Sequence, residues 1–398
     1  MIVTNKTASK TVRIMRRVTN NMQKRWIASI ITVSLLAVLL LSPALATAEK
    51  AEPSIESQAA ILIEQSTGKV LFGQNAHQRL PMASTTKIMT ALIAIERGNL
   101  DDLVTTASEA YGVEGSSMYI QKNEKLSLKD LVYGLMLNSG NDAAIAIAIH
   151  IGGSIEGFAD LMNERALSLG LTSTHFVTPN GLHDPEHYTS AFDLAAIARE
   201  AMNNETFREI AATPYYNTET GNVKRTLKSK NKILWQYEGG NGIKTGYTEV
   251  AGKCLVFSAK RTDMELIGVV LNSPDIFPES MDMLDYGFEA FSMSRMVKAG
   301  EPVARVRVNK GVKGLVSVTV DKDIIVPVKI EEGALLKTRI VIPRRVDAPV
   351  EKGAEIGTLE LWDGTRLVAS QPLVAMEDIG SWGLEEYFNM LLGVLTGR

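Results

Sequence analysis

Hydrophobic and polar positions along the chain follow several repeat patterns, and each pattern predicts a structural element. Residues 59–75 contain two short apolar runs and predict two strands joined by a turn at Ser66-Thr67-Gly68. Residues 84–97 repeat apolar positions at helical spacing, which predicts a helix that ends at Gly98. Four further segments predict helices on the same grounds, namely residues 126–137, 142–153, 154–170 and 190–204. At the start of the first of these four, Ser127 and Asp130 have the spacing of a capping pair.

The later part of the main domain changes from helical spacing to strands. Residues 174–191 are rich in turn-forming residues and predict a loop. Three apolar runs at 242–246, 253–261 and 264–273 predict strands, the last two joined by a turn near residues 261–263. Helices followed by a late group of strands predict an α+β fold rather than a repeated βαβ sheet.

The amino-acid composition changes near residue 299. Residues 299–375 are rich in Val, Ile and Lys and carry turn signals every several residues, which predicts a small all-β domain. Residues 378–398 return to helical spacing, with apolar side chains on one face at Leu384, Phe388, Leu391, Leu392 and Leu395. We therefore place a main domain at 49–296, a β domain at 297–376 and an amphipathic helix at 377–398.

The terminal helix predicts contact with a membrane surface, because an amphipathic helix can lie in the membrane interface. Its polar face carries Glu385 and Glu386, which anionic lipids disfavour, so packing on the β domain stays open as the alternative.

The N-terminus predicts export. Residues 1–25 carry seven basic residues and no acidic one, residues 26–42 are apolar, and Ala46 and Ala48 form an A-x-A site. This order is typical of a secretory signal peptide covering residues 1–48. A retained N-terminal membrane helix is the alternative, since about 17 apolar residues reach the lower limit of a span. On either alternative, the rest of the chain is expected at the extracytoplasmic face of the cell membrane.

Charge and cysteine content exclude some functions. Loss of residues 1–48 removes seven basic residues and no acidic ones, so the formal net charge changes from −3 to −10. An acidic exported domain is a poor binder of nucleic acid. The single cysteine, Cys254, lies in an apolar run and predicts a small core residue rather than a reactive thiol.

Three short motifs carry candidate chemistry, and the first is Ser84-Thr85-Thr86-Lys87. Positions i and i+3 share a helix face, so Lys87 can reach the Ser84 hydroxyl. A serine is a weak nucleophile until a base takes its proton, and a lysine can serve as that base if burial or nearby cations favour its neutral form. The alternative is a serine cap followed by a surface lysine.

The other two motifs lie at a helix junction and on a strand. In Ser139-Gly140-Asn141, Ser139 could relay a proton and Asn141 could bind a substrate amide. The alternative is that these three residues form an ordinary turn between two helices. Lys244-Thr245-Gly246 offers a cation and a hydroxyl for a substrate carboxylate, and its glycine allows close approach to the strand. The alternative is an edge-strand lysine followed by a turn.

The ordered combination of these motifs resembles the signature of penicillin-binding proteins and class A β-lactamases. The segments "SGNDAA", "TPNGLHDP" followed by "YTSA", and "GIKTGYT" followed by "AG" resemble the low-molecular-mass penicillin-binding proteins that act as serine-type D-alanyl-D-alanine carboxypeptidases. The resemblance covers nearly the whole chain after residue 54. It implies a catalytic domain of antiparallel sheet and helices, like that of the serine β-lactamases and transpeptidases, followed by the small β domain and the terminal helix.

The resemblance also implies a reaction. Ser84 would attack the bond between the two terminal D-alanines of a peptidoglycan stem pentapeptide, with Lys87 as base, and form an acyl-enzyme. The oxyanion would lie between the backbone N–H groups of Ser84 and Tyr247, and Ser139 would pass a proton to the departing D-alanine. Asn141, Lys244, Thr245 and Gly246 would bind the substrate. β-Lactams would acylate the same serine, and no cofactor or metal is implied.

Two positions depart from the pattern of some relatives. Tyr247 stands where some carry His, which affects substrate preference more than reaction type. Near residues 228–235 some relatives use an Arg for the substrate carboxylate, whereas this chain offers only lysines such as Lys230, so that role stays open.

Other functions stay as alternatives. A β-lactamase needs a deacylating carboxylate that the sequence does not identify, and a D,D-endopeptidase usually lacks the added β domain. A wall-binding scaffold on a degenerate site is disfavoured by the intact motifs. A Ser-His-Asp hydrolase is disfavoured because the G-x-S-x-G turn is missing, and a zinc site at His183 and His187 because Pro185 interrupts a helix there.

Overall fold

The computed structural model describes residues 50–330, 336–383 and 388 of the 398-residue chain. The predicted signal peptide at 1–48 lies outside these residues, as does most of the predicted terminal helix. Among the described residues, no single helix has the length and apolarity of a membrane span, and one bent pair of helices, 141–152 with 155–168, meets that test by length and composition only.

The main domain is built on a five-stranded sheet whose pairings are all antiparallel. Its strand order is β2-β1-β9-β8-β7, so β7 lies at an edge. The strands are β1 Ala59–Glu64, β2 Val70–Gln74, β7 Gly240–Thr248, β8 Gly252–Arg261 and β9 Met264–Ser273. The predicted hairpins at 59–75 and 253–273 are confirmed, and Thr262 takes a positive φ of 52° in the second turn.

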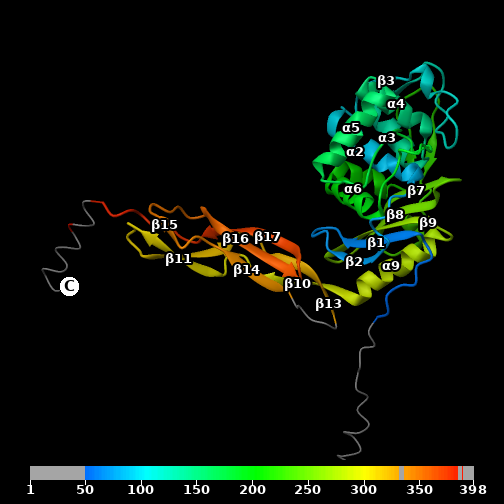
Figure 1. Cartoon of the computed structure of the whole chain (residues 1–398). Helices are drawn as coiled ribbons and strands as arrows, with labels where there is room; N and C mark the ends of the chain where they lie inside the picture. Colours follow the sequence, from blue (N-terminus) through cyan, green and yellow to red (C-terminus); the bar gives the residue numbers. More distant parts are fainter. Residues whose placement is uncertain (1–49, 331–335, 384–387, 389–398) are drawn as a thin grey trace, which may run out of the picture. The chain divides into compact units, whose positions relative to one another are not determined.

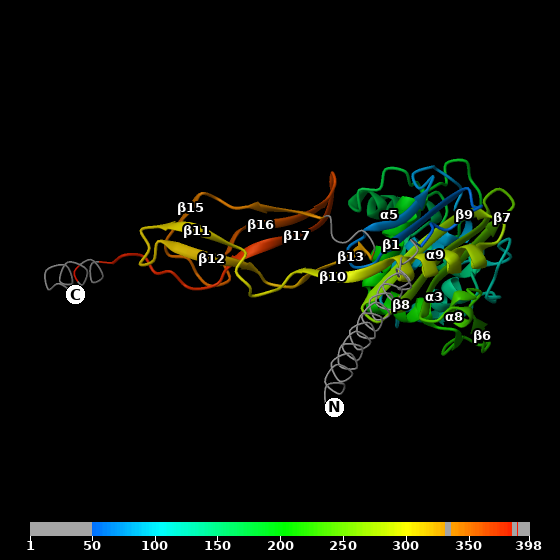
Figure 2. The same cartoon turned by 90° about the horizontal axis from the view of Figure 1, so that it is seen from below.

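Helices cover both faces of this sheet (Figures 1 and 2). On one face lie α2 Lys87–Arg97, α6 Ala191–Asn203 and α7 Glu205–Ala212, and α3 Leu128–Leu137, α4 Asn141–Gly152 and α5 Ile155–Ser168 pack on α2. The other face carries α9 Ile276–Ala290. Shorter elements complete the unit: η1 Ala83–Thr86, β3 Leu103–Thr105, η2 Ser108–Ala110, β4 Lys125–Ser127, β5 Tyr215–Asn217, β6 Thr226–Lys228 and α8 Ile233–Gln236. The predicted α+β arrangement is confirmed.

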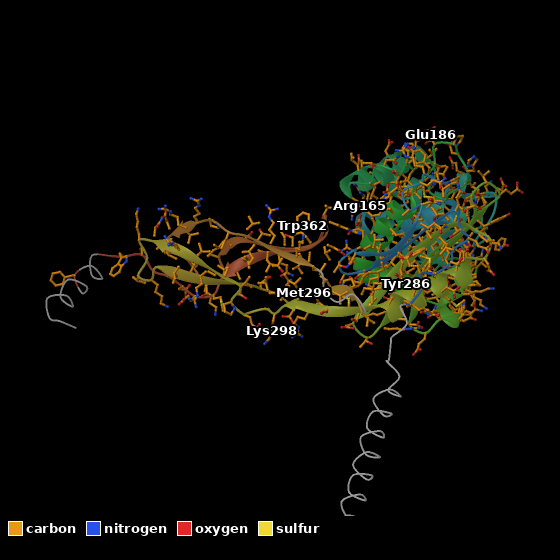
Figure 3. All side chains as sticks on the ribbon, turned by 60° about the horizontal axis from the view of Figure 1, so that its bottom comes forward. Arg165, Glu186, Tyr286, Met296, Lys298 and Trp362 are labelled. Carbon is orange, nitrogen blue, oxygen red and sulfur yellow. The ribbon has the colours of Figure 1, made fainter. Side chains whose placement is uncertain are left out.

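Two apolar cores hold the layers together. The larger lies between the sheet and α2 to α7, and includes the predicted core residue Cys254, which is fully buried. The smaller lies between the sheet and α9, where Tyr286, labelled in Figure 3, contacts Phe72 and Phe291 edge-on at ring distances of 6.4 and 5.8 Å. The sheet is therefore fixed from both faces.

Only one of the two hydrogen bonds expected of the capping pair at the start of α3 is formed. The Ser127 hydroxyl accepts a hydrogen bond from the Asp130 backbone N–H at 3.1 Å, as expected of an N-cap. The Asp130 carboxylate does not return the bond, because it accepts instead from Glu219 N, Thr220 N and Tyr216 Oη. The Ser127 backbone N–H donates to Thr220 Oγ1 at 2.8 Å. Asp130 thus holds the loop at 216–220 as well as the helix.

The C-terminal unit is all-β, as predicted. A six-stranded sheet has the order β14-β16-β17-β12-β11-β15, and β10 pairs with β13 separately. Their bounds are β10 Phe291–Val297, β11 Ala304–Asn309, β12 Leu315–Val320, β13 Ile324–Lys329, β14 Lys337–Val341, β15 Arg345–Asp347, β16 Glu355–Asp363 and β17 Arg366–Ala375. Its core consists mainly of Val, Leu and Ile side chains.

The start of the predicted terminal helix is wrong. Residues 377–383 are not helical, because Ile379 forms a β-bridge with Val350 and Ser381 forms one with Gly311. Ile379 is also buried in the β-domain core. These residues belong to the β domain, and the predicted helix beyond them falls on residues 384–387 and 389–398, outside the described residues.

Candidate active site

Ser84 and Lys87 meet where a short 3₁₀ turn leads into α2. Ser84 lies in η1, and Lys87 is the first residue of α2. Ala83 holds a positive φ of 49°, which is uncommon for a residue with a side chain and marks local backbone strain. The Thr85 and Thr86 hydroxyls stabilise the turn by donating to the Met82 and Ala83 carbonyls at 2.6 and 2.8 Å. The predicted helix at 84–97 is confirmed from Lys87 onward.

The Lys87 amine is buried in contact with three oxygen atoms. Its Nζ lies 2.8 Å from Ser84 Oγ, 2.7 Å from Asn141 Oδ1 and 2.5 Å from the Asn180 carbonyl. Burial holds the pKa of Lys87 well below its ordinary value, and the nearby Lys244 and Lys230 lower it further, while Asp142 raises it. A lysine with a lowered pKa, within hydrogen-bond distance of a serine hydroxyl, can accept the serine proton.

Ser139 and Lys244 form a second contact beside the first. Lys244 on β7 donates from Nζ to Ser139 Oγ and to the Thr245 carbonyl, both at 3.0 Å. Burial lowers the pKa of Lys244 to about 7, with the Lys230 charge as the second cause. Ser139 lies between α3 and α4 with a positive φ of 61°, which marks a second strained residue at the site.

The edge strand β7 lies against the start of α2. A Cβ built on Gly246 lies 3.0 Å from Ser84 N and 3.1 Å from Thr85 N, so a side chain at this position presses on the turn that carries Ser84. The glycine therefore allows the strand to approach the serine closely. Tyr247 follows on the same strand, and the predicted oxyanion site between its N–H and that of Ser84 stays a prediction.

A cavity of about 710 Å³ opens over these groups. The sequence-predicted residues on its wall are Ser84, Ser139, Asn141, Thr245, Gly246 and Tyr247. Lys87 and Lys244 lie buried next to them. The structure thus brings all eight predicted site residues together from three separate parts of the chain. Among the described residues, no group of three or more His, Cys, Asp or Glu side chains could hold a metal ion.

Several residues of the site were not predicted from the sequence. Asn180 and Gly181 line the cavity, and the Asn180 carbonyl contacts Lys87. Gly181 has a φ of 81°, and a Cβ there lies 2.0 Å from the Ala83 carbonyl, so the loop packs directly on the serine turn. A turn-forming Pro-Asn-Gly marks a bend in a sequence, but it does not show which element the bend will touch.

Lys230 is the lysine whose role stayed open. Its Nζ donates to Ser116 Oγ at 2.9 Å, and both residues lie on the cavity wall. Burial lowers the pKa of Lys230 below its ordinary value. The wall therefore holds a second lysine amine, apart from the Lys244–Ser139 contact.

Comparisons with known proteins agree with this geometry. The family model described as D-alanyl-D-alanine carboxypeptidase matches residues 46–275, and the model of the penicillin-binding protein 5 C-terminal domain matches residues 291–381. The chain belongs to the D-alanyl-D-alanine carboxypeptidase family. Together with the relatives described next, this membership makes it a low-molecular-mass penicillin-binding protein and a serine D-Ala-D-Ala carboxypeptidase that acts on peptidoglycan.

Individual relatives extend over most of the chain. The D-alanyl-D-alanine carboxypeptidase DacF of Bacillus subtilis is 35% identical over 351 residues, covering 86% of this chain and 90% of that protein. DacD of Salmonella typhimurium is 32% identical, covering 90% of this chain and 97% of that protein. The crystal structure of penicillin binding protein 5 from Haemophilus influenzae covers 83% of this chain and 100% of that one, with 31% identity and a TM-score of 0.71.

Proposed function

We propose that the chain is an exported D,D-carboxypeptidase that removes the terminal D-alanine of peptidoglycan stem pentapeptides through an acyl-enzyme on Ser84. The observation that carries this proposal is the buried Lys87 amine, 2.8 Å from Ser84 Oγ and lowered in pKa by its surroundings. A lysine amine with a lowered pKa is neutral at a lower pH than an ordinary lysine, which suits it to accept the serine proton.

Acylation follows from the contacts of these two residues. Ser84 Oγ attacks the carbonyl carbon of the penultimate D-alanine while Lys87 takes the hydroxyl proton. The charge that develops on the carbonyl oxygen is expected between the N–H groups of Ser84 and Tyr247. The C–N bond then breaks, and the leaving amine takes a proton through Ser139, which the Lys244 contact orients. The products of this step are free D-alanine and an ester on Ser84.

Deacylation and substrate binding use the remaining groups. Water attacks the ester, restores the Ser84 hydroxyl and releases the shortened peptide. Lys244 and Thr245 are expected to bind the terminal carboxylate, and Asn141 to bind a peptide amide. A β-lactam carries a strained amide and a carboxylate in a similar arrangement, so it should open on Ser84 and leave a slowly hydrolysed ester.

The acyl-enzyme is tested by intact-protein mass after incubation with benzylpenicillin. The parent protein should gain the mass of one penicillin and the Ser84→Ala variant none, while Ser168→Ala, at an exposed serine of α5 outside the cavity wall, should still be acylated. Acylation of Ser84→Ala to the same extent as the parent would overturn the assignment of the nucleophile. No acylation of a folded parent would favour the scaffold alternative.

The proposed location is the extracytoplasmic face of the membrane, with the terminal helix as an anchor. Its support is the basic, apolar and small-residue order of residues 1–48 and the helical spacing of the apolar residues over 384–395 in the sequence. Deletion of residues 384–398, which leaves the β-domain residues 377–383 in place, should release the protein from the membrane fraction, and unchanged sedimentation would contradict the anchor. A mature N-terminus at Glu49 would support cleavage, and one at Met1 would contradict it.

A further inference from the structure

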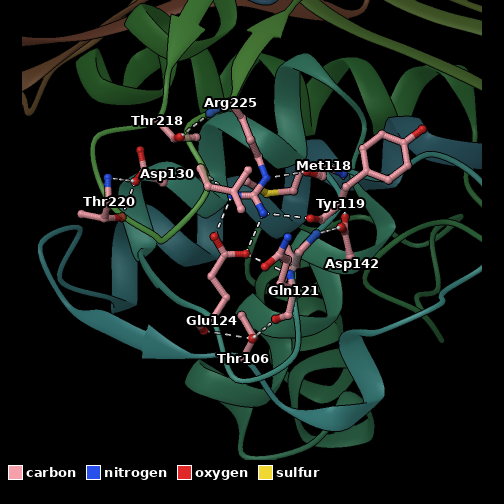
Figure 4. A network of polar contacts seen from close by, with 12 residues as sticks. Thr106, Met118, Tyr119, Gln121, Glu124, Asp130, Asp142, Thr218, Thr220 and Arg225 are labelled. Carbon is pink, nitrogen blue, oxygen red and sulfur yellow. Dashed lines mark hydrogen bonds and ion pairs between the residues drawn. The ribbon is translucent and has the colours of Figure 1, made fainter.

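One wall of the cavity is formed by an irregular segment, whose backbone N–H and C=O groups are not paired within a strand or a helix. Residues 115–120 are irregular, and Gly115, Ser116, Ser117 and Tyr119 line the cavity. Buried backbone N–H and C=O groups need partners, and those of an irregular segment must come from side chains or other loops. In this segment two charged side chains supply most of these partners (Figure 4).

The Asp142 carboxylate accepts hydrogen bonds from donor groups of this segment. The residue is 3% exposed and belongs to the first turn of α4. Its carboxylate accepts from Met118 N at 3.1 Å, Ile120 N at 3.1 Å and Ser117 Oγ at 2.6 Å, and from Ala143 N at 2.9 Å within its own helix. One carboxylate therefore joins three residues of the segment, Ser117, Met118 and Ile120, to the start of α4.

The Arg225 guanidinium donates hydrogen bonds to carbonyl groups of the same segment. Its Nε donates to the Met118 carbonyl and its Nη2 to the Tyr119 carbonyl, both at 2.8 Å. The guanidinium is itself fixed by a fork of two bonds to Glu124, at 2.8 and 2.6 Å. The two side chains of this ion pair are 8% and 1% exposed. Such a buried pair is costly to break by removing one partner.

The wall is connected to the catalytic lysine through Asn141. The Asn141 backbone N–H donates to the Ser116 carbonyl at 2.7 Å, and its Nδ2 donates to the Glu114 carbonyl at 2.5 Å. Its Oδ1 accepts from Lys87 Nζ at 2.7 Å. A displacement of the wall therefore moves the amide that orients the Lys87 amine.

We propose that Asp142 and Arg225 are positioning residues of the reaction, which hold residues 117–120 in place from their donor and acceptor sides and so keep Asn141 on Lys87. This inference rests on the proposed Ser84–Lys87 acylation. The alternative is that the network only stabilises the fold, and the two differ in what happens to the rate of acylation in a folded variant.

The test compares two arginine-to-lysine variants in the full chain. Arg225→Lys keeps the charge but loses the planar fork that reaches Glu124 and the two wall carbonyls. Arg208→Lys is the matched control, because Arg208 also binds both oxygens of a buried carboxylate, Glu265, and one backbone carbonyl, Met202 O. Arg208 and Glu265 are not part of the cavity wall. Both variants weaken contacts with a buried carboxylate and should lose stability, Arg225→Lys more than Arg208→Lys because the two side chains are 8% and 32% exposed.

The readout is the second-order rate of acylation by a fluorescent penicillin at a temperature where both variants are folded. Arg225→Lys should acylate more slowly by about tenfold or more, since small misplacements of catalytic groups have effects of this order. Arg208→Lys should stay within about twofold of the parent. If Arg225→Lys does not fold, Glu124→Gln replaces it, because the glutamine keeps the shape of Glu124 and weakens its hold on the guanidinium.

The pH dependence of acylation gives a second readout that a purely structural role would not change. The charged groups that act on Lys87 are Lys244 on β7, Lys230 before α8 and Asp142 on α4. Lys87 in turn lowers the pKa of His187 in the loop at 174–191. Arg225→Lys leaves all of them in place. A loosened wall admits water to Lys87, which weakens the burial that lowers its pKa, so the acid limb of the profile should move to higher pH.

The outcomes of the test distinguish failure of the inference from failure of the proposed function. A folded Arg225→Lys variant with the parental rate and the parental acid limb would overturn the inference. An equal loss of rate in Arg208→Lys would overturn it too, because the effect would then follow stability alone. A parent that is not acylated at all would instead refute the proposed function.

Discussion

Replacing His187 with asparagine should remove a pH dependence from the stability of the catalytic domain. His187 is 3% exposed, and its Nδ1 accepts hydrogen bonds from Val177 N at 3.0 Å and Thr178 N at 3.3 Å. The proton of the neutral ring is therefore on Nε2, which lies 2.8 Å from Thr86 Oγ1. The Thr86 hydroxyl donates in turn to the Ala83 carbonyl. A second proton on Nδ1 would break the bonds from both backbone N–H groups.

The magnitude follows from the pKa of this ring. Burial, the largest cause, lowers the pKa of His187 from 6.5 to about 4, and the neighbouring His175, His183 and Lys87 lower it as well, against Asp184. Between these two values the unfolded chain binds more protons than the folded one, so stability is complete above about pH 6.5 and falls as the pH decreases toward 4. The loss between roughly pH 7 and pH 5 should be about 2 kcal/mol.

Urea unfolding followed by far-ultraviolet circular dichroism measures this effect, because the long helices of the described chain all lie in the catalytic domain. His187→Asn keeps an acceptor for the two N–H groups and cannot titrate. Between the two pH values, the free energy of unfolding of His187→Asn should change by about 2 kcal/mol less than that of the parent. The control His77→Asn alters an exposed histidine and should behave as the parent does. An equal change in the parent and in His187→Asn would refute the reasoning.

Three further predictions concern the reaction itself. Lys87→Met should slow acylation by about 10²–10⁴-fold, the range typical of a lost general base, without loss of the folded structure; stopped-flow acylation measures it, and a loss under about tenfold would contradict the role. Because the pKa of Lys244 is about 7, its charge is lost as the pH rises through that value, so kcat/KM for a peptide with a free carboxylate should fall above about pH 7. The Lys244→Arg variant should lack that alkaline limb, and an unchanged limb would assign it to another group. Gly246→Ala should lower the acylation rate by about tenfold or more, since its Cβ presses on Ser84 N at 3.0 Å; a parental rate would show that the turn can move aside.

The sequence allowed the elements and the catalytic motifs to be predicted for a simple reason. Strands such as Met264–Ser273 and helices such as Lys87–Arg97 have apolar patterns that match the local period of the structure. The three motifs each lie at the end of a helix or on an edge strand, where a side chain can reach a cavity. Helix α9 was not predicted, although Pro278 near its start and its apolar spacing are both signals of a helix.

Residues that act through long-range contacts could not be predicted from local patterns. Arg225 and Glu124 are 101 positions apart, and Asn180 and Lys87 are 93 apart. Each looks like an ordinary surface or turn residue until the fold buries it. The same holds for Asp130, whose spacing from Ser127 predicted a reciprocal cap, whereas tertiary contacts direct its carboxylate to residues 216–220.

The central claim is that Ser84, activated by Lys87, is the nucleophile of a D,D-carboxypeptidase. The most direct measurement is release of D-alanine from a stem pentapeptide by the purified protein and by its Ser84→Ala variant, both shown to be folded by circular dichroism. The account predicts release by the parent and none above background by the variant. Equal release by both proteins would contradict it, because the reaction would then proceed without the Ser84 hydroxyl.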